Sequence, residues 1–149
     1  MPNAYSIRPV ARQIVLLDTG STDRTVEIAT ELGAEIHRFT WNDNFSDARN
    51  AALEHARGDW VLCLDADEEI LPVEHAKLME AMKAPEIMGY RLPLTNCGLN
   101  EAGGSYVPRM FRNAPGLFFV GRVHEQVFPS VLVRCAEWKL RTGVGGAEI

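Results

Sequence analysis

The chain has 149 residues, of which 46% are hydrophobic and 23% are charged. This composition is ordinary for a globular protein, and the length suffices for one domain with a sizeable core. We therefore interpret residues 1–149 as a single domain. The net charge of −5 and the scatter of basic residues along the chain argue against binding to a phosphate backbone. We expect no nucleic-acid partner.

Three cysteines, Cys63, Cys97 and Cys135, show neither a close pair nor the spacing of a metal site. An odd cysteine count fits a reducing compartment better than a disulfide scaffold. No apolar run approaches the roughly 18–20 residues that a membrane-spanning helix needs, and the first residues lack a signal-peptide pattern. We expect a cytoplasmic protein, with peripheral contact at the inner face of the membrane left open.

Three short apolar segments predict buried strands. Residues 13–17 form a continuous, partly β-branched run, residues 34–39 alternate in polarity, and residues 60–64 are the most apolar stretch of the chain. Runs of this length, bounded by polar turns, are typical of strands inside a sheet.

Three segments with helical apolar spacing follow these strands. The first helix begins after a cap at Ser21 or Thr22 and stops at Gly33. The second covers residues 46–57, with its first residue as the N-cap, and the third covers residues 72–83, with proline in its first turn. This alternation predicts an α/β fold whose mainly parallel sheet is flanked by helices.

The pattern changes in the second half of the chain. Residues 88–94 and 105–112 predict two antiparallel strands, a hairpin added to the parallel core. Residues 122–126 predict a turn or short helix, and residues 130–135 a further strand. The glycine-rich tail, residues 142–149, is expected to fray.

Two of the predicted strands end in acidic turns. Asp18 follows the first strand, and Asp65 and Asp67 follow the third. Open α/β sheets bind their ligands at the carboxyl ends of the strands. Carboxylates at positions i and i+2 in such a place suit a hard cation, Mg²⁺ or Mn²⁺. The alternative is a solvated acidic turn whose charges favour the dipole of the next helix.

Four segments resemble motifs of one enzyme family. Residues 15–25, VLLDTGSTDRT, resemble its "VDxGSTDxT" segment, and residues 45–53 resemble its "ARNxAL" helix. Residues 58–68 resemble its "GDWVLxLDADE" strand and metal turn. Residues 116–125 resemble a "GRVHE" element of a subset that includes lipopolysaccharide-core sugar transferases. In this order and spacing, the chain is similar to the family 2 glycosyltransferases of the GT-A fold.

The resemblance implies a metal-dependent, inverting enzyme. Such an enzyme moves a sugar from a nucleotide-diphosphate donor to a hydroxyl acceptor, a saccharide or a lipid-linked molecule, in cell-envelope polysaccharide or lipopolysaccharide synthesis. One alternative is a non-catalytic nucleotide-sugar-binding or assembly module that has lost the complete donor pocket. Another is a phosphotransfer pocket, which would need a well-placed lysine, and Lys139 is the only late one.

The resemblance also assigns roles around the acidic turns. Asp18 would contact the nucleoside, and Arg49 would bind the nucleotide or its phosphates. Asp65 would face the ribose or the metal, and Asp67 would be the principal ligand of Mg²⁺ or Mn²⁺. Asp23 is expected only to cap the helix that follows it.

The second group of candidates lies late in the chain. An inverting transfer needs a base for the acceptor hydroxyl, and Glu125 is the candidate, whereas His124 would reach the metal or the diphosphate. The alternative is a turn with an ordinary exposed histidine and glutamate. Arg109, Arg112 and Arg122 would either add positive charge near the diphosphate or occupy stacked and surface positions.

Members of the family normally begin with a further strand and helix before the strand predicted at residues 13–17. Only 13 residues precede Ile14, so we expect a chain truncated at its N-terminus relative to the family. The strand would then have an open edge, which a second copy covers in a homo-oligomer.

Overall fold

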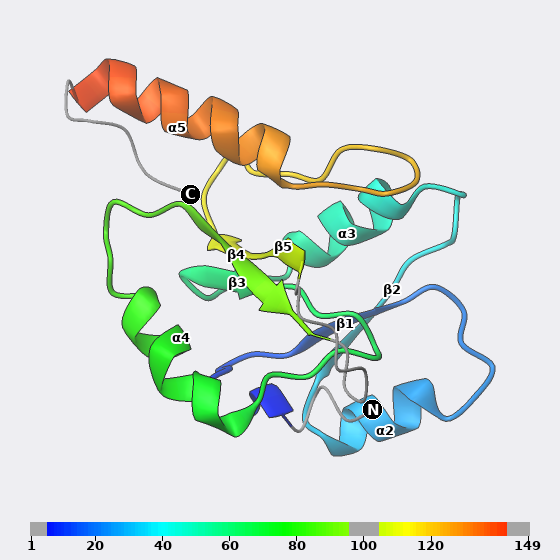
Figure 1. Cartoon of the computed structure of the whole chain (residues 1–149). Helices are drawn as coiled ribbons and strands as arrows, with labels where there is room; N and C mark the ends of the chain where they lie inside the picture. Colours follow the sequence, from blue (N-terminus) through cyan, green and yellow to red (C-terminus); the bar gives the residue numbers. More distant parts are fainter. Residues whose placement is uncertain (1–5, 96–104, 143–149) are drawn as a thin grey trace.

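The computed structural model describes residues 6–95 and 105–142, with side chains described as far as residue 137. The predicted frayed tail beyond residue 142 and the loop that joins the two hairpin strands lie outside these residues. The elements are β1 (Val15–Asp18), α2 (Thr25–Glu31), β2 (Glu35–Arg38), α3 (Phe45–Leu53), β3 (Trp60–Leu62), the 3₁₀ turn η1 (Pro72–Glu74), α4 (His75–Ala81), β4 (Gly89–Leu94), β5 (Ser105–Arg112) and α5 (Phe128–Thr142) (Figure 1).

The strands form two sheets. Strands β1 and β2 pair in parallel, whereas β3, β5 and β4 form an antiparallel sheet in that order. The α/β class and the added hairpin are as predicted, but the expected mainly parallel sheet is not what the described residues form. The reason is that β5 pairs with β3 as well as with β4, with Trp60 opposite Arg112. The most apolar strand therefore has an antiparallel neighbour.

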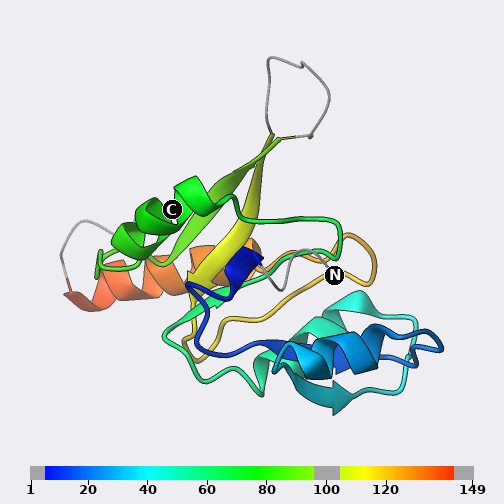
Figure 2. The same cartoon turned by 90° about the horizontal axis from the view of Figure 1, so that it is seen from below.

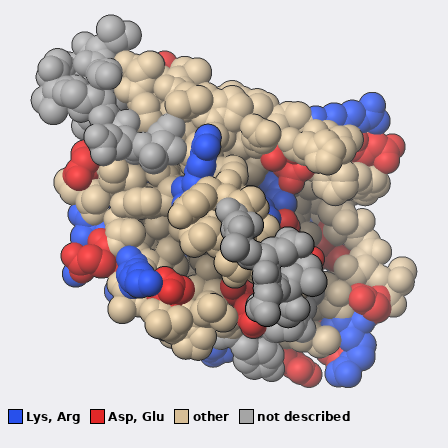
Figure 3. All heavy atoms as spheres, in the orientation of Figure 1, with Lys and Arg blue, Asp and Glu red and all other residues tan. Residues whose placement is uncertain are grey.

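The two sheets lie on different sides of the molecule. Figure 2 shows β1, β2 and α2 on one side, and β4 and β5 with α4 and α5 on the other. Helix α3 packs against β1. On the face in Figure 3, acidic and basic side chains are interspersed. None of the helices in the described part of the chain is long and apolar enough to span a bilayer.

The helix starts differ from the predicted ones. The N-cap of α3 is Asn44, whose side chain accepts the Ser46 and Asp47 N–H groups at 3.1 and 3.4 Å. Ser46, the expected cap, is buried and donates instead to the Gly121 carbonyl at 2.6 Å. Before α2, the Asp23 carboxylate accepts the Thr25 N–H at 3.0 Å, which agrees with the capping role expected for Asp23. Neither Ser21 nor Thr22 is the N-cap, because this position is Arg24. The α helices also end earlier than predicted, at Leu53 in α3 and Ala81 in α4.

The strand predicted at residues 130–135 is wrong, because these residues lie within α5. The run is rich in valine and reads as a strand by composition. The buried apolar residues of α5, however, are Phe128, Val131 and Cys135, which recur at helical spacing. They complete the core, whose buried members are Phe111, Phe119, Val127, Phe128, Val131 and Cys135.

The predicted turn before α5 is present. Val120 and Gln126 form an isolated antiparallel bridge, with both N–H···O distances at 2.9 Å. Gly121 and His124 have φ angles of 104° and 57°. This turn carries Glu125 to the side of α3.

Candidate functional site

The acidic turn after β3 is a tightly bonded structure. The Glu68 N–H donates to the Asp65 carbonyl at 3.0 Å, and the Asp65 N–H donates to the Glu68 carboxylate at 3.1 Å. Asp67 lies between them and is exposed. The turn therefore presents the Asp67 carboxylate to solvent, while Asp65 and Glu68 hydrogen-bond to each other.

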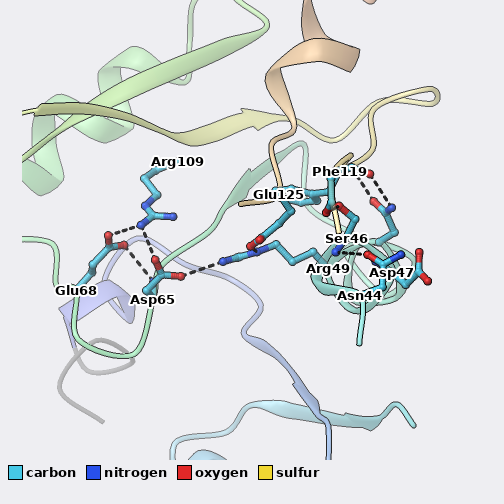
Figure 4. A network of polar contacts seen from close by, with 11 residues as sticks. Asn44, Ser46, Asp47, Arg49, Asp65, Glu68, Arg109, Phe119 and Glu125 are labelled. Atoms are coloured by element: carbon cyan, nitrogen blue, oxygen red, sulfur yellow. Dashed lines mark hydrogen bonds and ion pairs between the residues drawn. The ribbon is translucent and has the colours of Figure 1, made fainter. Parts of the chain in front are cut away.

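Arg109, from β5, binds this turn on its inner side. Its Nη2 donates to Asp65 Oδ2 at 2.6 Å and forms an ion pair with Glu68 (Figure 4). The pairing of β5 with β3 brings Arg109 there, because the Cys63 N–H donates to the Arg109 carbonyl at 2.8 Å. The Arg109 and Glu68 side chains are only 18% and 11% exposed.

Arg49, from α3, binds the other oxygen of Asp65. Its Nη2 donates to Asp65 Oδ1 at 2.9 Å, and its Nε pairs with Glu125, whose side chain is 12% exposed. The result is one continuous chain of ion pairs, Glu125–Arg49–Asp65–Arg109–Glu68, which we call the ion-pair network (Figure 4). It joins α3, the turn after β3, β5 and the turn before α5.

The network lowers the pKa of Asp65. Burial opposes ionisation of Asp65, but the hydrogen bond from Arg49 and the charge of Arg109 outweigh it, so the pKa of Asp65 lies below its ordinary value. Beneath the two arginines, burial raises the pKa of the Cys63 thiol to about 11. Cys63 is therefore a neutral thiol at neutral pH.

A hollow of about 260 Å³ lies beside the network. Both arginines, Glu125 and His124 line it, together with apolar side chains that include Phe119. His124 and Glu125 are neighbours in the turn before α5, where His124 has a positive φ angle, and both line this hollow. The hollow offers cationic, acidic and aromatic groups to one ligand.

Asp18, the other predicted carboxylate, lies at the end of β1 and is partly buried. Its Oδ1 accepts the Ser21 N–H at 2.9 Å, and hydrogen bonding to Ser21 lowers its pKa. Across the described ranges, no three histidine, cysteine or acidic residues lie close enough together to hold a metal ion by themselves. Asp18, Asp65 and Asp67 therefore do not form a preassembled three-carboxylate site.

The acidic turn nonetheless fits a hydrated cation. Mg²⁺ is commonly bound through one or two carboxylates together with substrate phosphates and waters. Asp67 is exposed, with no hydrogen-bond partner in the portion of the chain that the structure describes. Asp65 lies two residues away, with its side chain 43% exposed.

The three later arginines separate into different roles. Only Arg109 joins the network. The Arg112 guanidinium lies 4.2 Å from the centre of the Trp60 ring and donates to the Ala84 carbonyl at 2.7 Å. Arg122 donates to the Asp43 carbonyl at 2.8 Å and is exposed. Sequence reasoning missed the pairing of Glu68 with Arg109, because it depends on the order of strands in the sheet.

The sequence model of glycosyl transferase family 2 matches residues 6–126. This range contains both acidic turns, the whole ion-pair network and the turn before α5. The chain belongs to glycosyl transferase family 2.

Several proteins resemble the chain in sequence, and some of them are named as glycosyltransferases. A TPR repeat-containing protein of Synechococcus elongatus is 39% identical over 127 residues, or 85% of this chain and 32% of that protein. The SPbeta prophage-derived glycosyltransferase SunS of Bacillus subtilis is 30% identical over 125 residues, or 81% of this chain and 30% of SunS. An undecaprenyl-phosphate 4-deoxy-4-formamido-L-arabinose transferase of Edwardsiella ictaluri is 39% identical over 75 residues, or 46% of this chain and 23% of that enzyme. The chain therefore spans about a third or less of the length of these relatives.

Proposed function

We propose that this family 2 member transfers a sugar, with inversion, from a nucleotide-diphosphate donor to a hydroxyl acceptor. The observation that carries the proposal is the acidic turn after β3. Asp65 is fixed between two guanidinium groups there, while Asp67 stands exposed beside it. A firmly held turn with one available carboxylate suits the binding of a cation-bound diphosphate.

In this proposal Asp67, joined by Asp65, holds Mg²⁺ or Mn²⁺. When bound, the ion offsets the negative charge that develops on the leaving diphosphate. Asp18, at the end of β1, contacts the nucleoside. Arg49 adds positive charge on the diphosphate side of the hollow, and His124 contacts the diphosphate or the metal.

Glu125 serves as the base. The acceptor hydroxyl oxygen attacks the anomeric carbon while the bond from that carbon to the diphosphate oxygen breaks. The diphosphate leaves with the electron pair, and Glu125 takes the hydroxyl proton. Arg49 holds Glu125 through Oε1. Within the described residues Oε2 has no hydrogen-bond partner, so this oxygen is available to the acceptor.

The acceptor in this proposal is a saccharide or a lipid-linked molecule of the cell envelope. One relative is named as an undecaprenyl-phosphate transferase, and this name supports the lipid-linked class. We place the reaction in the cytoplasm, with the acceptor presented at the inner face of the membrane.

The test is donor turnover by the wild-type chain and two variants. Release of the nucleoside diphosphate is measured with Mn²⁺ over a panel of nucleotide sugars, with hydroxyl acceptors present and absent. We expect Asp67→Ala to lower the rate by about 100-fold or more. Glu69→Ala removes a charge that is also exposed and lies in the same loop, and it should retain the wild-type rate.

Two results would contradict the proposal. Equal rates in Asp67→Ala and Glu69→Ala would remove Asp67 from the chemistry. A wild-type chain that binds nucleotide sugars and releases no nucleoside diphosphate would be the non-catalytic binding module instead.

A further inference from the structure

A general need for positive charge in the site does not explain the particular contacts that Arg109 makes. One of its nitrogens, Nη2, contacts carboxylates of two different residues, Asp65 at 2.6 Å and Glu68. These carboxylates belong to the two ends of a single four-residue turn. Arg109 therefore joins the beginning of the turn to its end.

Glu68 makes the second half of this arrangement. Its carboxylate accepts the Asp65 N–H at 3.1 Å and pairs with Arg109, while its own N–H donates to the Asp65 carbonyl at 3.0 Å. With a side chain 11% exposed, it is not one of the solvated acids of the loop. Glu68 closes the turn, and Arg109 offsets the charge that this closure buries.

Electrostatics make the two residues interdependent. Asp65 and Glu68 place two carboxylates against one nitrogen atom, and without a cation this closeness is unfavourable. A guanidinium is planar and weakly hydrated, which suits a partly buried contact with several carboxylate oxygens. A lysine ammonium is a strongly hydrated point charge on a flexible stem, and it would hold the two carboxylates less firmly.

We propose that Arg109 and Glu68 are positioning residues of the donor site. Together they hold the Asp65–Glu68 turn in the shape that presents Asp67 to a cation-bound nucleoside diphosphate. This role rests on the proposed function. Arg109 takes no part in the transfer step, and it acts through Asp65 and Glu68.

The same strand supplies a matched control. Arg112 is also an arginine of β5 and is also partly buried, but its guanidinium stacks on Trp60 and binds main-chain carbonyls. It makes no contact with the acidic turn. A lysine at this position disturbs packing in the same sheet and leaves the turn intact.

The experiment measures Mn²⁺ binding by electron paramagnetic resonance of the free ion, with UDP, GDP and dTDP in separate titrations. The proteins are the wild type, Arg109→Lys, Glu68→Gln and Arg112→Lys. We expect the Mn²⁺ Kd in the presence of the nucleotide to rise about tenfold in Arg109→Lys and in Glu68→Gln. Arg112→Lys should lower the melting temperature and keep the wild-type Kd.

The outcomes distinguish the two proposals. If Arg109→Lys and Glu68→Gln both bind Mn²⁺ and the nucleotide with the wild-type Kd, the positioning role is overturned and the proposed function still stands. A wild type that binds none of the three nucleotides with Mn²⁺ would remove the proposed function and the positioning role together. Should Arg109→Lys fail to fold, Glu68→Gln decides, because glutamine has nearly the same shape as glutamate but lacks its charge and has an NH2 group in place of one acceptor oxygen.

Discussion

The two acidic turns of this molecule both begin with an aspartate after an apolar run, but they are built differently. Asp18 leaves β1 into a turn closed by a contact three residues away, the Ser21 N–H. Asp65 leaves β3 into a turn fixed by Arg49 and Arg109, which are 16 and 44 residues away. One carboxylate is placed by local chain geometry, and the other by the tertiary fold.

The difference indicates a division of roles between the Asp18 and Asp65 carboxylates. A carboxylate such as Asp18, which is partly buried and held only by a local contact, adjusts to its ligand at small cost, and this suits contact with a nucleoside. A carboxylate held from two sides is preorganised, and preorganisation matters most where charge develops during a reaction. The following predictions test this division, beginning with the largest expected effect.

Removal of Arg49 should destabilise the fold most. Arg49→Met leaves Glu125, with a side chain 12% exposed, without its cationic partner. We expect the free energy of unfolding to fall by about 3 kcal/mol, measured by urea denaturation at pH 7. The matched control is Arg24→Met, which breaks the exposed pair with Glu27 and should have no measurable effect. Equal losses in the two variants would show that the network is no more stabilising than a surface pair.

The thiol beneath the network should give the protein an alkaline stability limit. Burial raises the pKa of Cys63 from 9.0 to about 11, so the folded state retains the proton longer than the unfolded state. The resulting stability is complete below pH 9.0 and is lost as the pH rises through about 11. Relative to Cys63→Ala, the wild type should lose on the order of 2 kcal/mol of unfolding free energy over this window. If the unfolding free energies of the two proteins change with pH in parallel, the burial of the thiol is contradicted.

Substitutions of Asp18 and Asp65 should differ in their effects on ligand binding and on stability. Asp18→Ala should weaken binding of the nucleotide with Mn²⁺ and leave the urea midpoint unchanged, because Asp18 has only a local partner. Asp65→Ala should lower both, since it leaves Arg49 and Arg109 each without one carboxylate partner. Both quantities are measured on the same preparations. A loss of stability in Asp18→Ala equal to that in Asp65→Ala would remove the distinction between the turns.

The smallest expected effect is weak self-association through β1. Among the described strands, only β2 pairs with β1, so one edge of this strand has no partner strand there. Open edges favour pairing with another chain. We expect light scattering to show a mass that rises toward the dimer at micromolar concentration, and a constant monomer mass would argue against this edge as an interface.

Local patterns were sufficient for several elements. The strand predicted at residues 105–112 coincides with β5, and the apolar runs gave β1, β2 and β3 to within a few residues. The local sequence patterns failed where a strand-like composition and a helical spacing compete in one segment. Residues 130–135 have the composition of a strand, but their buried positions follow helical spacing because α5 packs on the core.

The candidate site was predictable only in part, because local patterns do not specify contacts between distant segments. Asp65, Asp67 and Glu125 were named from motifs, but the contact of Arg109 with the acidic turn was not. That contact follows from β5 lying between β3 and β4, and no periodicity in the sequence specifies the order of strands. The choice of Asn44 over Ser46 as helix cap likewise depends on the distant Gly121 carbonyl.

Thermal unfolding of the wild type and Asp67→Ala, over a panel of nucleotide sugars with and without Mn²⁺, tests most directly whether the acidic turn after β3 binds a cation-bound donor. At a ligand concentration about 100 times its Kd, the wild type should gain roughly 2.7 kcal/mol of stability. We expect this gain with at least one nucleotide sugar, only with Mn²⁺, and not in Asp67→Ala. A wild-type melting temperature unchanged over the whole panel, or the same gain in Asp67→Ala, would contradict the account.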